Sequence, residues 1–84
     1  MKYSLITFRS VTPAQRGESI LRKHGIRCFI RRTPRWMEEQ GCGYSLQLDM
    51  QDVVRGIKVL TDNEIPFRKA YRIGDNGRGE EWIL

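Results

Sequence analysis

The residues best suited to chemistry form the stretch Gln40-Gly41-Cys42-Gly43-Tyr44, where one thiol stands between two glycines. Glycine has no Cβ, so Gly41 and Gly43 allow the backbone to turn sharply and leave the sulfur approachable. A thiol becomes a useful nucleophile or sulfur acceptor when its pKa falls, because the thiolate is the reactive form. Cys42 is therefore the candidate catalytic residue. The alternative is a small side chain that fills a tight turn.

Length and composition limit the classes of protein to consider. A chain of 84 residues, 39% hydrophobic and 30% charged, is typical of one small globular domain with a thin core. No apolar run reaches the roughly 20 residues of a membrane span, and the first residues show no signal-peptide pattern. We therefore expect a cytoplasmic protein that does not enter a membrane. Two cysteines and one histidine are too few for a four-ligand structural zinc site, and we expect neither a metal nor a cofactor.

The hydrophobic periodicity predicts the element order β-α-β-β-α-β. Thr12 is expected as the N-cap of the first helix, with Pro13 in its first position and Gln15 closing a capping box. Gly25 and Asn63 are expected to end the two helices. The expected strands cover residues 3–8, 26–32, 44–49 and 67–73. The expected helices cover residues 13–24 and a stretch that begins at Asp49 or Gln51.

This order is typical of an α+β, ferredoxin-like sandwich, a four-stranded antiparallel sheet with both helices on one face. We expect one domain over residues 1–73 and a C-terminal tail over residues 74–84. The Trp82-Ile83-Leu84 end of that tail could pack on the domain or on a neighbour.

In this topology the start of the third strand lies at the same edge as the end of the first strand and the start of the first helix. Arg9, Ser10 and Thr12 should therefore converge with Cys42. The basic residues Arg31, Arg32 and Arg35 should lie close to them. A helix N-terminus and nearby guanidinium groups both favour a thiolate. For Arg9, Ser10 and Arg35, the alternative is an ordinary solvated position.

Over about residues 3–71 the chain resembles the selenium/sulfur carrier-like proteins, a family of small domains. The resemblance rests on Thr7-Phe8-Arg9-Ser10 followed by a helix with Ala14, on Gly25-Ile26, on Pro34-Arg35, and chiefly on Cys42-Gly43. It does not extend to the Cys-Pro-X-Pro helix start of other sulfur-transfer carriers, so their mechanism is not carried over.

The resemblance implies that Cys42 accepts sulfur or selenium, as a persulfide or selenopersulfide, and passes it to a partner protein. The implied partners are thus a protein donor and a protein acceptor. Arg9 and Arg35 would stabilise the anion, and Ser10 or backbone N–H groups near Thr12 would donate hydrogen bonds.

For the remaining candidate residues, a structural role is a better explanation than a catalytic or ligand-binding role. Cys28 alternates in phase with Ile26 and Ile30, which indicates a core position. His24 lies on the apolar stripe near a helix end, where a packed or capping residue is expected rather than a ligand. The basic residues Arg27, Arg31, Arg32, Arg35, Arg68, Lys69 and Arg72 are typical of a solvated face.

Two other functions are open alternatives. The net charge of +5 and a fold shared with RNA-binding domains would suit a nucleic-acid-binding module. Residues 44–48, however, lack the Arg/Lys-Gly-Phe/Tyr pattern of such domains, which counts against a nucleic-acid partner without excluding one. The other alternative is a small regulatory or assembly domain that binds a partner through its open sheet face. A second copy of the chain could be that partner, which would give a homodimer.

Overall fold

The computed structural model describes residues 3–33, 43–74 and 79–81. Its elements are β1 (Tyr3–Phe8), α1 (Val11–Lys23), β2 (Cys28–Arg32), β3 (Tyr44–Leu48), the short 3-10 helix η2 (Met50–Asp52), α2 (Val53–Asp62), β4 (Ala70–Ile73) and β5 (Gly79–Glu81). The predicted order β-α-β-β-α-β is present from β1 to β4. Within these ranges neither α-helix has the length and hydropathy that a membrane crossing requires.

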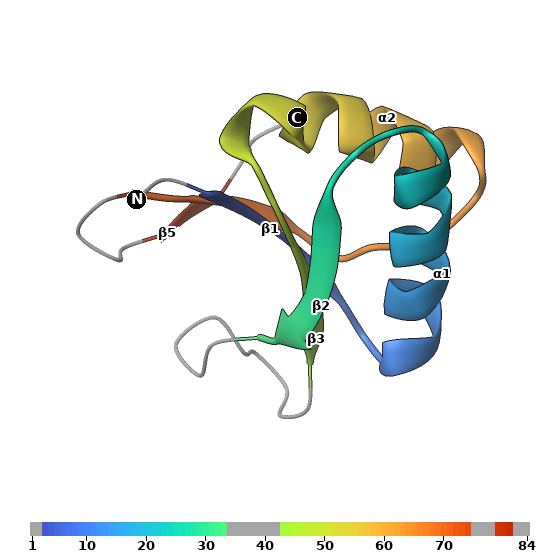
Figure 1. The fold of residues 1–84 in the computed structure, drawn as a ribbon. Coiled ribbons are helices and arrows are strands. Elements are labelled where there is room, and N and C mark those ends of the chain that lie inside the picture. The colour runs from blue at the N-terminus through green and yellow to red at the C-terminus, as the bar shows by residue number, and fades with distance from the viewer. Residues whose placement is uncertain (1–2, 34–42, 75–78, 82–84) are drawn as a thin grey trace.

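The strands form one antiparallel sheet in the order β2-β3-β1-β4-β5 (Figure 1). β1 is central, since Ser4 pairs with Leu48 of β3 on one side and with Arg72 of β4 on the other. The four strands β2-β3-β1-β4 and two helices confirm the predicted ferredoxin-like α+β fold. The sequence did not predict β5, whose Glu80 pairs with Arg72 and so continues the sheet beyond β4.

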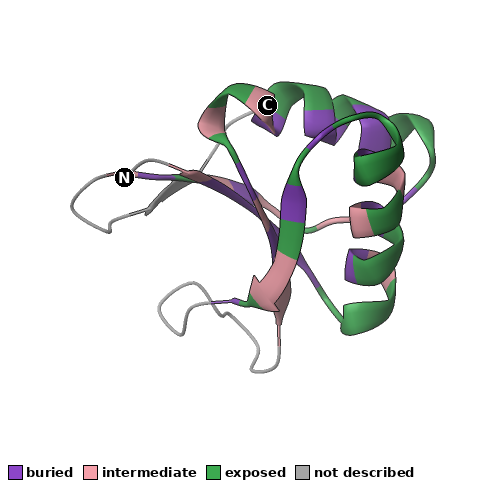
Figure 2. Ribbon diagram, in the orientation of Figure 1, coloured by how far each residue is buried: buried purple, intermediate pink, exposed green. Residues whose placement is uncertain are grey.

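The core lies between one face of the sheet and the two helices, whose buried residues face inwards (Figure 2). Every second residue of a strand points to the same face, so Ile6 and Phe8 of β1 enter this core together. Leu5 is buried in a second, smaller cluster with Ile73. The main buried cluster draws on both helices and the sheet: Ile6, Phe8, Ala14, Leu21, Cys28, Leu46, Leu48, Val53, Ile57, Leu60 and Ala70 belong to it.

Two helical glycines let the helices lie close to the sheet. A Cβ at Gly17 of α1 would stand 3.1 Å from Cδ1 of Leu46 and 3.1 Å from Cδ2 of Leu60. A Cβ at Gly56 of α2 would stand 3.1 Å from Cδ1 of Leu48. Each glycine costs its helix about 1 kcal/mol relative to alanine. This cost is offset by the close packing of each helix against its neighbours.

α1 ends in a Schellman motif at Gly25, the residue that the sequence predicted to end this helix. The Ile26 N–H donates to the Leu21 carbonyl at 3.0 Å, and the Gly25 N–H donates to the Arg22 carbonyl at 3.0 Å. Gly25 has φ +77, the left-handed conformation that this motif needs and that glycine adopts without steric cost.

α2 ends in the same motif, after Asn63 as its predicted C-cap. The Ile65 N–H donates to the Leu60 carbonyl at 2.9 Å, and the Glu64 N–H donates to the Thr61 carbonyl at 3.1 Å. Here the left-handed residue is Glu64, with φ +56. A side chain therefore occupies a conformation that glycine tolerates better.

Several predicted boundaries were wrong. α1 begins at Val11 with Ser10 as its N-cap, not Thr12, because Pro13 is tolerated anywhere in a first turn, where N–H groups have no helical partner. β2 begins at Cys28 rather than Ile26, since Ile26 closes the Schellman motif. β4 begins at Ala70 rather than Phe67.

Candidate functional site

Three chain segments meet at one edge of the sheet. Tyr44, the first residue of β3, pairs with Phe8, the last residue of β1, and with Arg32, the last residue of β2. Ser10 follows two residues after Phe8 and is the N-cap of α1. We call this edge, formed by residues 8–10, 32–33 and 43–44, the Gly43 edge. In Figure 1 it lies at the lower end of the sheet.

The structure places Arg9, Ser10, Thr12 and Gly43 at or beside the Gly43 edge. Arg9, Ser10 and Thr12 are all exposed there. The other predicted site residues, Arg35, Gly41 and Cys42, lie outside the described residues. The roles expected of all seven therefore stay predictions.

The start of α1 gives the Gly43 edge a positive electrostatic character. The first turn of α1 contains no acidic residue, and Ser10 makes no side-chain capping hydrogen bond. The first N–H groups of a helix lack helical partners and carry partial positive charge. Together with the exposed Arg9 guanidinium, this helix start favours an anion at the edge.

Gly43 has a packing reason to be glycine. It is not among the described residues with positive φ, so a sharp turn does not require glycine here. Instead, a Cβ at this position would stand 3.1 Å from Oγ1 of Thr33 and 3.4 Å from its Cβ. The Thr33 N–H also donates to the Gly43 carbonyl at 3.1 Å. Gly43 thus lets the end of β2 and the start of β3 approach each other closely.

A buried pair of hydroxyl groups supports this approach. Thr33 Oγ1 and Ser45 Oγ lie 2.6 Å apart, and both side chains are buried. A hydrogen bond shielded from water holds two strands in one register, because breaking it leaves an unsatisfied buried group. Sequence reasoning missed this pair, whose only signal is the position of Thr33 directly before Pro34 and of Ser45 two residues after Gly43.

A fourth segment reaches the same end of the sheet through Thr7. The Thr7 N–H donates to the Lys69 carbonyl at 2.8 Å, and the Arg68 N–H donates to the Thr7 carbonyl at 2.7 Å. The Thr7 hydroxyl oxygen also accepts a hydrogen bond from the Lys69 N–H at 3.1 Å. Arg68 and Lys69, predicted only as part of a basic surface, therefore lie beside the end of β1.

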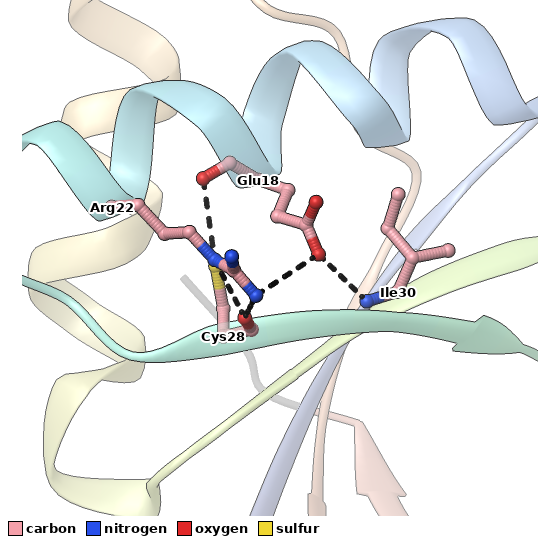
Figure 3. A network of polar contacts seen from close by, with 4 residues as sticks. All are labelled: Glu18, Arg22, Cys28 and Ile30. Atoms are coloured by element: carbon pink, nitrogen blue, oxygen red, sulfur yellow. Dashed lines mark hydrogen bonds and ion pairs between the residues drawn. The ribbon is translucent and has the colours of Figure 1, made fainter.

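The second cysteine, Cys28, lies on β2 beside Glu18 and Arg22 of α1 (Figure 3). It is only 4% exposed and belongs to the main core cluster, as the sequence predicted. Its Sγ donates to the Glu18 carbonyl at 3.8 Å. Burial, and secondarily the charge of Glu18, raise the pKa of the Cys28 thiol, while Arg22 acts in the opposite direction. Cys28 is thus a buried thiol that stays protonated at neutral pH.

The described part of the chain holds no group of three or more His, Cys, Asp and Glu side chains placed to bind a metal ion. His24 is exposed at the C-cap of α1, so the predicted capping position is correct and packing in the core is not. Its carbonyl oxygen accepts a hydrogen bond from Arg55 at 2.6 Å.

Comparison with known proteins adds one match. A family model described as "Putative Se/S carrier protein-like" matches residues 2–72. These residues include β1 to β3, both helices and most of β4, together with the Cys42-Gly43 pair. No curated protein and no solved structure matches the chain.

Proposed function

The chain belongs to the Se/S carrier protein-like family, and on that premise we propose that it carries sulfur or selenium on Cys42. Cys42 receives the chalcogen from a donor protein and passes it to an acceptor protein. The bound forms are a persulfide for sulfur and a selenopersulfide for selenium.

The observation that carries this proposal is the state of the other cysteine. A carrier thiol must be accessible to two proteins in turn and must ionise near neutral pH. Cys28 meets neither condition, because it is buried and its pKa is raised. Since the chain has two cysteines, the carrier role goes to Cys42.

The proposed transfer needs no outside oxidant or reductant. The Cys42 thiolate attacks the terminal sulfur of a donor persulfide, a new S–S bond forms, and the donor thiolate leaves with the electron pair of the broken bond. The acceptor thiolate then attacks the terminal sulfur on Cys42, and the Cys42 thiolate leaves. With selenium, the attacked atom is the terminal selenium of a donor selenopersulfide.

The Gly43 edge supports the anionic states of this cycle. Gly43 is joined directly to Cys42, and it lies at the edge that also holds Arg9 and the start of α1. Arg9 and Arg35 are proposed to stabilise the thiolate and the terminal chalcogen anion. Ser10 and the backbone N–H groups near Thr12 are proposed as hydrogen-bond donors.

The test is the rate at which each thiol reacts with iodoacetamide between about pH 6 and pH 9. Wild-type protein and Cys28→Ala should react rapidly at neutral pH, and Cys42→Ser should react only when unfolded. Arg9→Gln should slow the reaction at neutral pH several-fold, with the exposed Arg16→Gln as the matched control. Equal rates for Cys42 and Cys28 in the folded protein would refute the assignment.

A further inference from the structure

A groove lies at the end of the sheet opposite the Gly43 edge. It has a volume of about 650 Å³, within the range of small-molecule sites. It forms where the loop between α1 and β2 meets the end of β3 and the start of β1. Side chains able to contact a ligand include Tyr3, Arg22, Arg27, Phe29, Gln47 and Asp49. Among the described residues of the proposed carrier site, none of Arg9, Ser10, Thr12 and Gly43 lines it.

Two aromatic rings flank the groove. Phe29 is 51% exposed on β2, a large apolar surface left in water. Tyr3 stands on β1, and β3 runs between these two strands. Adjacent strands lie about 4.8 Å apart, so the two ring-bearing strands are separated by about 10 Å. The exposed Phe29 ring is therefore the surface on which a flat ring can stack, with Tyr3 at the other side of the groove.

Polar contacts hold two of the lining side chains in place. Arg22 donates Nη2 and Nε to the Cys28 carbonyl at 3.0 and 3.3 Å (Figure 3). Arg31 donates Nη1 to Oε1 of Gln47 at 2.8 Å, which directs the amide of Gln47. The same Arg31 guanidinium lies 6.0 Å from the centre of the Tyr3 ring. These contacts restrict the rotamers of Arg22 and Gln47 before binding, which lowers the side-chain entropy lost when a ligand is captured.

The charge of the groove suits a ligand with an anionic group. Two arginines, Arg22 and Arg27, line it against one aspartate, Asp49. Glu18 forms an ion pair of 3.6 Å with Arg22 and offsets part of its charge, so Arg27 is the main cationic group for an anion. Arg22 uses Nε and Nη2 in its contacts to Cys28, so its Nη1 is the atom that would meet a phosphate. Guanidinium groups bind phosphate well, and aromatic rings stack on bases.

We propose that this groove binds a nucleotide, with the base stacked on Phe29 and the phosphate at Arg22 and Arg27. The Gln47 amide contacts the edge of the base. The ligand is either a free nucleotide or the phosphorylated end of a single-stranded RNA, since both present the same base and phosphate. This site is separate from the carrier site, so a nucleotide binds equally well to Cys42→Ser.

The test is a titration of the full ¹⁵N-labelled chain, followed by NMR, with AMP, GMP, CMP and UMP up to about 5 mM. A parallel titration uses a 5′-phosphorylated single-stranded tetranucleotide. Expected shifts cluster at residues 22–29 and 47–49. Phe29→Leu and Arg27→Gln should each weaken binding about tenfold. Arg16→Gln, an exposed arginine outside the groove, should leave binding within about twofold of wild type.

Binding of free nucleotides would identify the small molecule as the ligand. Binding of the oligonucleotide alone would identify an RNA end. The proposal is overturned if neither ligand shifts the groove residues. It is also overturned if Arg16→Gln weakens binding as much as Arg27→Gln, because the attraction is then a diffuse charge effect.

Discussion

At Gly43, a single missing Cβ lets the start of β3 lie close to Thr33 at the end of β2. We predict that Gly43→Ala destabilises the fold by about 1 to 2 kcal/mol, because the new methyl group meets Thr33 Oγ1 at 3.1 Å. Urea denaturation measures this change. In a Thr33→Ala background the cost of Gly43→Ala should shrink, since the hydroxyl has gone. An equal cost in both backgrounds would show that Thr33 is not what excludes a side chain at residue 43.

The Cys28 thiol should leave a signature in the alkaline stability of the protein. Its pKa is raised in the folded state above the ordinary 9.0, so the unfolded chain loses this proton at lower pH. The stabilisation is complete below the unfolded pKa and falls as pH rises through the folded pKa. We therefore predict that wild-type protein loses more stability above about pH 9 than Cys28→Ala does. Parallel loss in both proteins would contradict this environment for Cys28.

Sequence reasoning identified the chemistry of individual residues better than their contacts. The alternation of Ile26, Cys28 and Ile30 correctly predicted that Cys28 is buried, because strand period is local information. The packing of Gly43 on Thr33 and the hydroxyl pair with Ser45 depend on the register between β2 and β3. That register joins residues far apart in the sequence, and no local pattern specifies it.

At the scale of elements, the two helix ends offer a matched pair of substitutions. Glu64 has φ +56 in the position that Gly25 fills at the end of α1 with φ +77. We predict that Glu64→Gly stabilises the protein by up to about 1 kcal/mol, because it removes the steric strain of a left-handed residue. Gly25→Ala should destabilise it by a similar amount. Thermal unfolding measures both. A destabilising Glu64→Gly would mean that the Glu64 side chain contributes more than its strain costs.

The outer edge of β2 is covered by side chains of α1. Glu18 Oε2 accepts a hydrogen bond from the Ile30 N–H at 3.2 Å, and Arg22 donates to the Cys28 carbonyl (Figure 3). An ion pair of 3.6 Å between Glu18 and Arg22 joins the two contacts. Edge strands with free backbone groups pair with other chains, and these contacts occupy two of those groups.

We predict that Glu18→Ala lowers stability by about 1 kcal/mol and promotes self-association through β2. Glu18→Gln is the control, because it removes the charge but keeps an acceptor for the Ile30 N–H. Sedimentation velocity across a concentration series distinguishes the variants. If Glu18→Ala stays as monomeric as Glu18→Gln, the hydrogen bond does not protect this edge.

Element order followed from the sequence, but element boundaries did not. The N-cap of α1 is Ser10 rather than the predicted Thr12, because proline fits any position of a first turn and so does not fix where the helix begins. Ile26, predicted as the first residue of β2, instead donates its N–H to the Schellman motif that ends α1. β5 is three residues long, and a strand that short carries no readable alternation.

At the scale of the whole molecule, the ferredoxin-like topology explains why distant residues share an edge. Its alternating chain directions bring the ends of β1 and β2 to the starts of α1 and β3, and the register of Tyr44 with Phe8 and Arg32 realises this arrangement. The fold class was predictable because helical and strand periods are visible locally. The groove opposite the Gly43 edge was not, since it combines residues of α1, β1, β2 and β3.

The carrier proposal is tested most directly by mass spectrometry of the protein purified without reductant. The account predicts a fraction of chains heavier by one sulfur or one selenium atom, with the added atom on the peptide that contains Cys42. Dithiothreitol should remove the added mass. Cys42→Ser should lack it, and Cys28→Ala should retain it. An added atom on Cys28, or a load that survives in Cys42→Ser, would contradict the central claim.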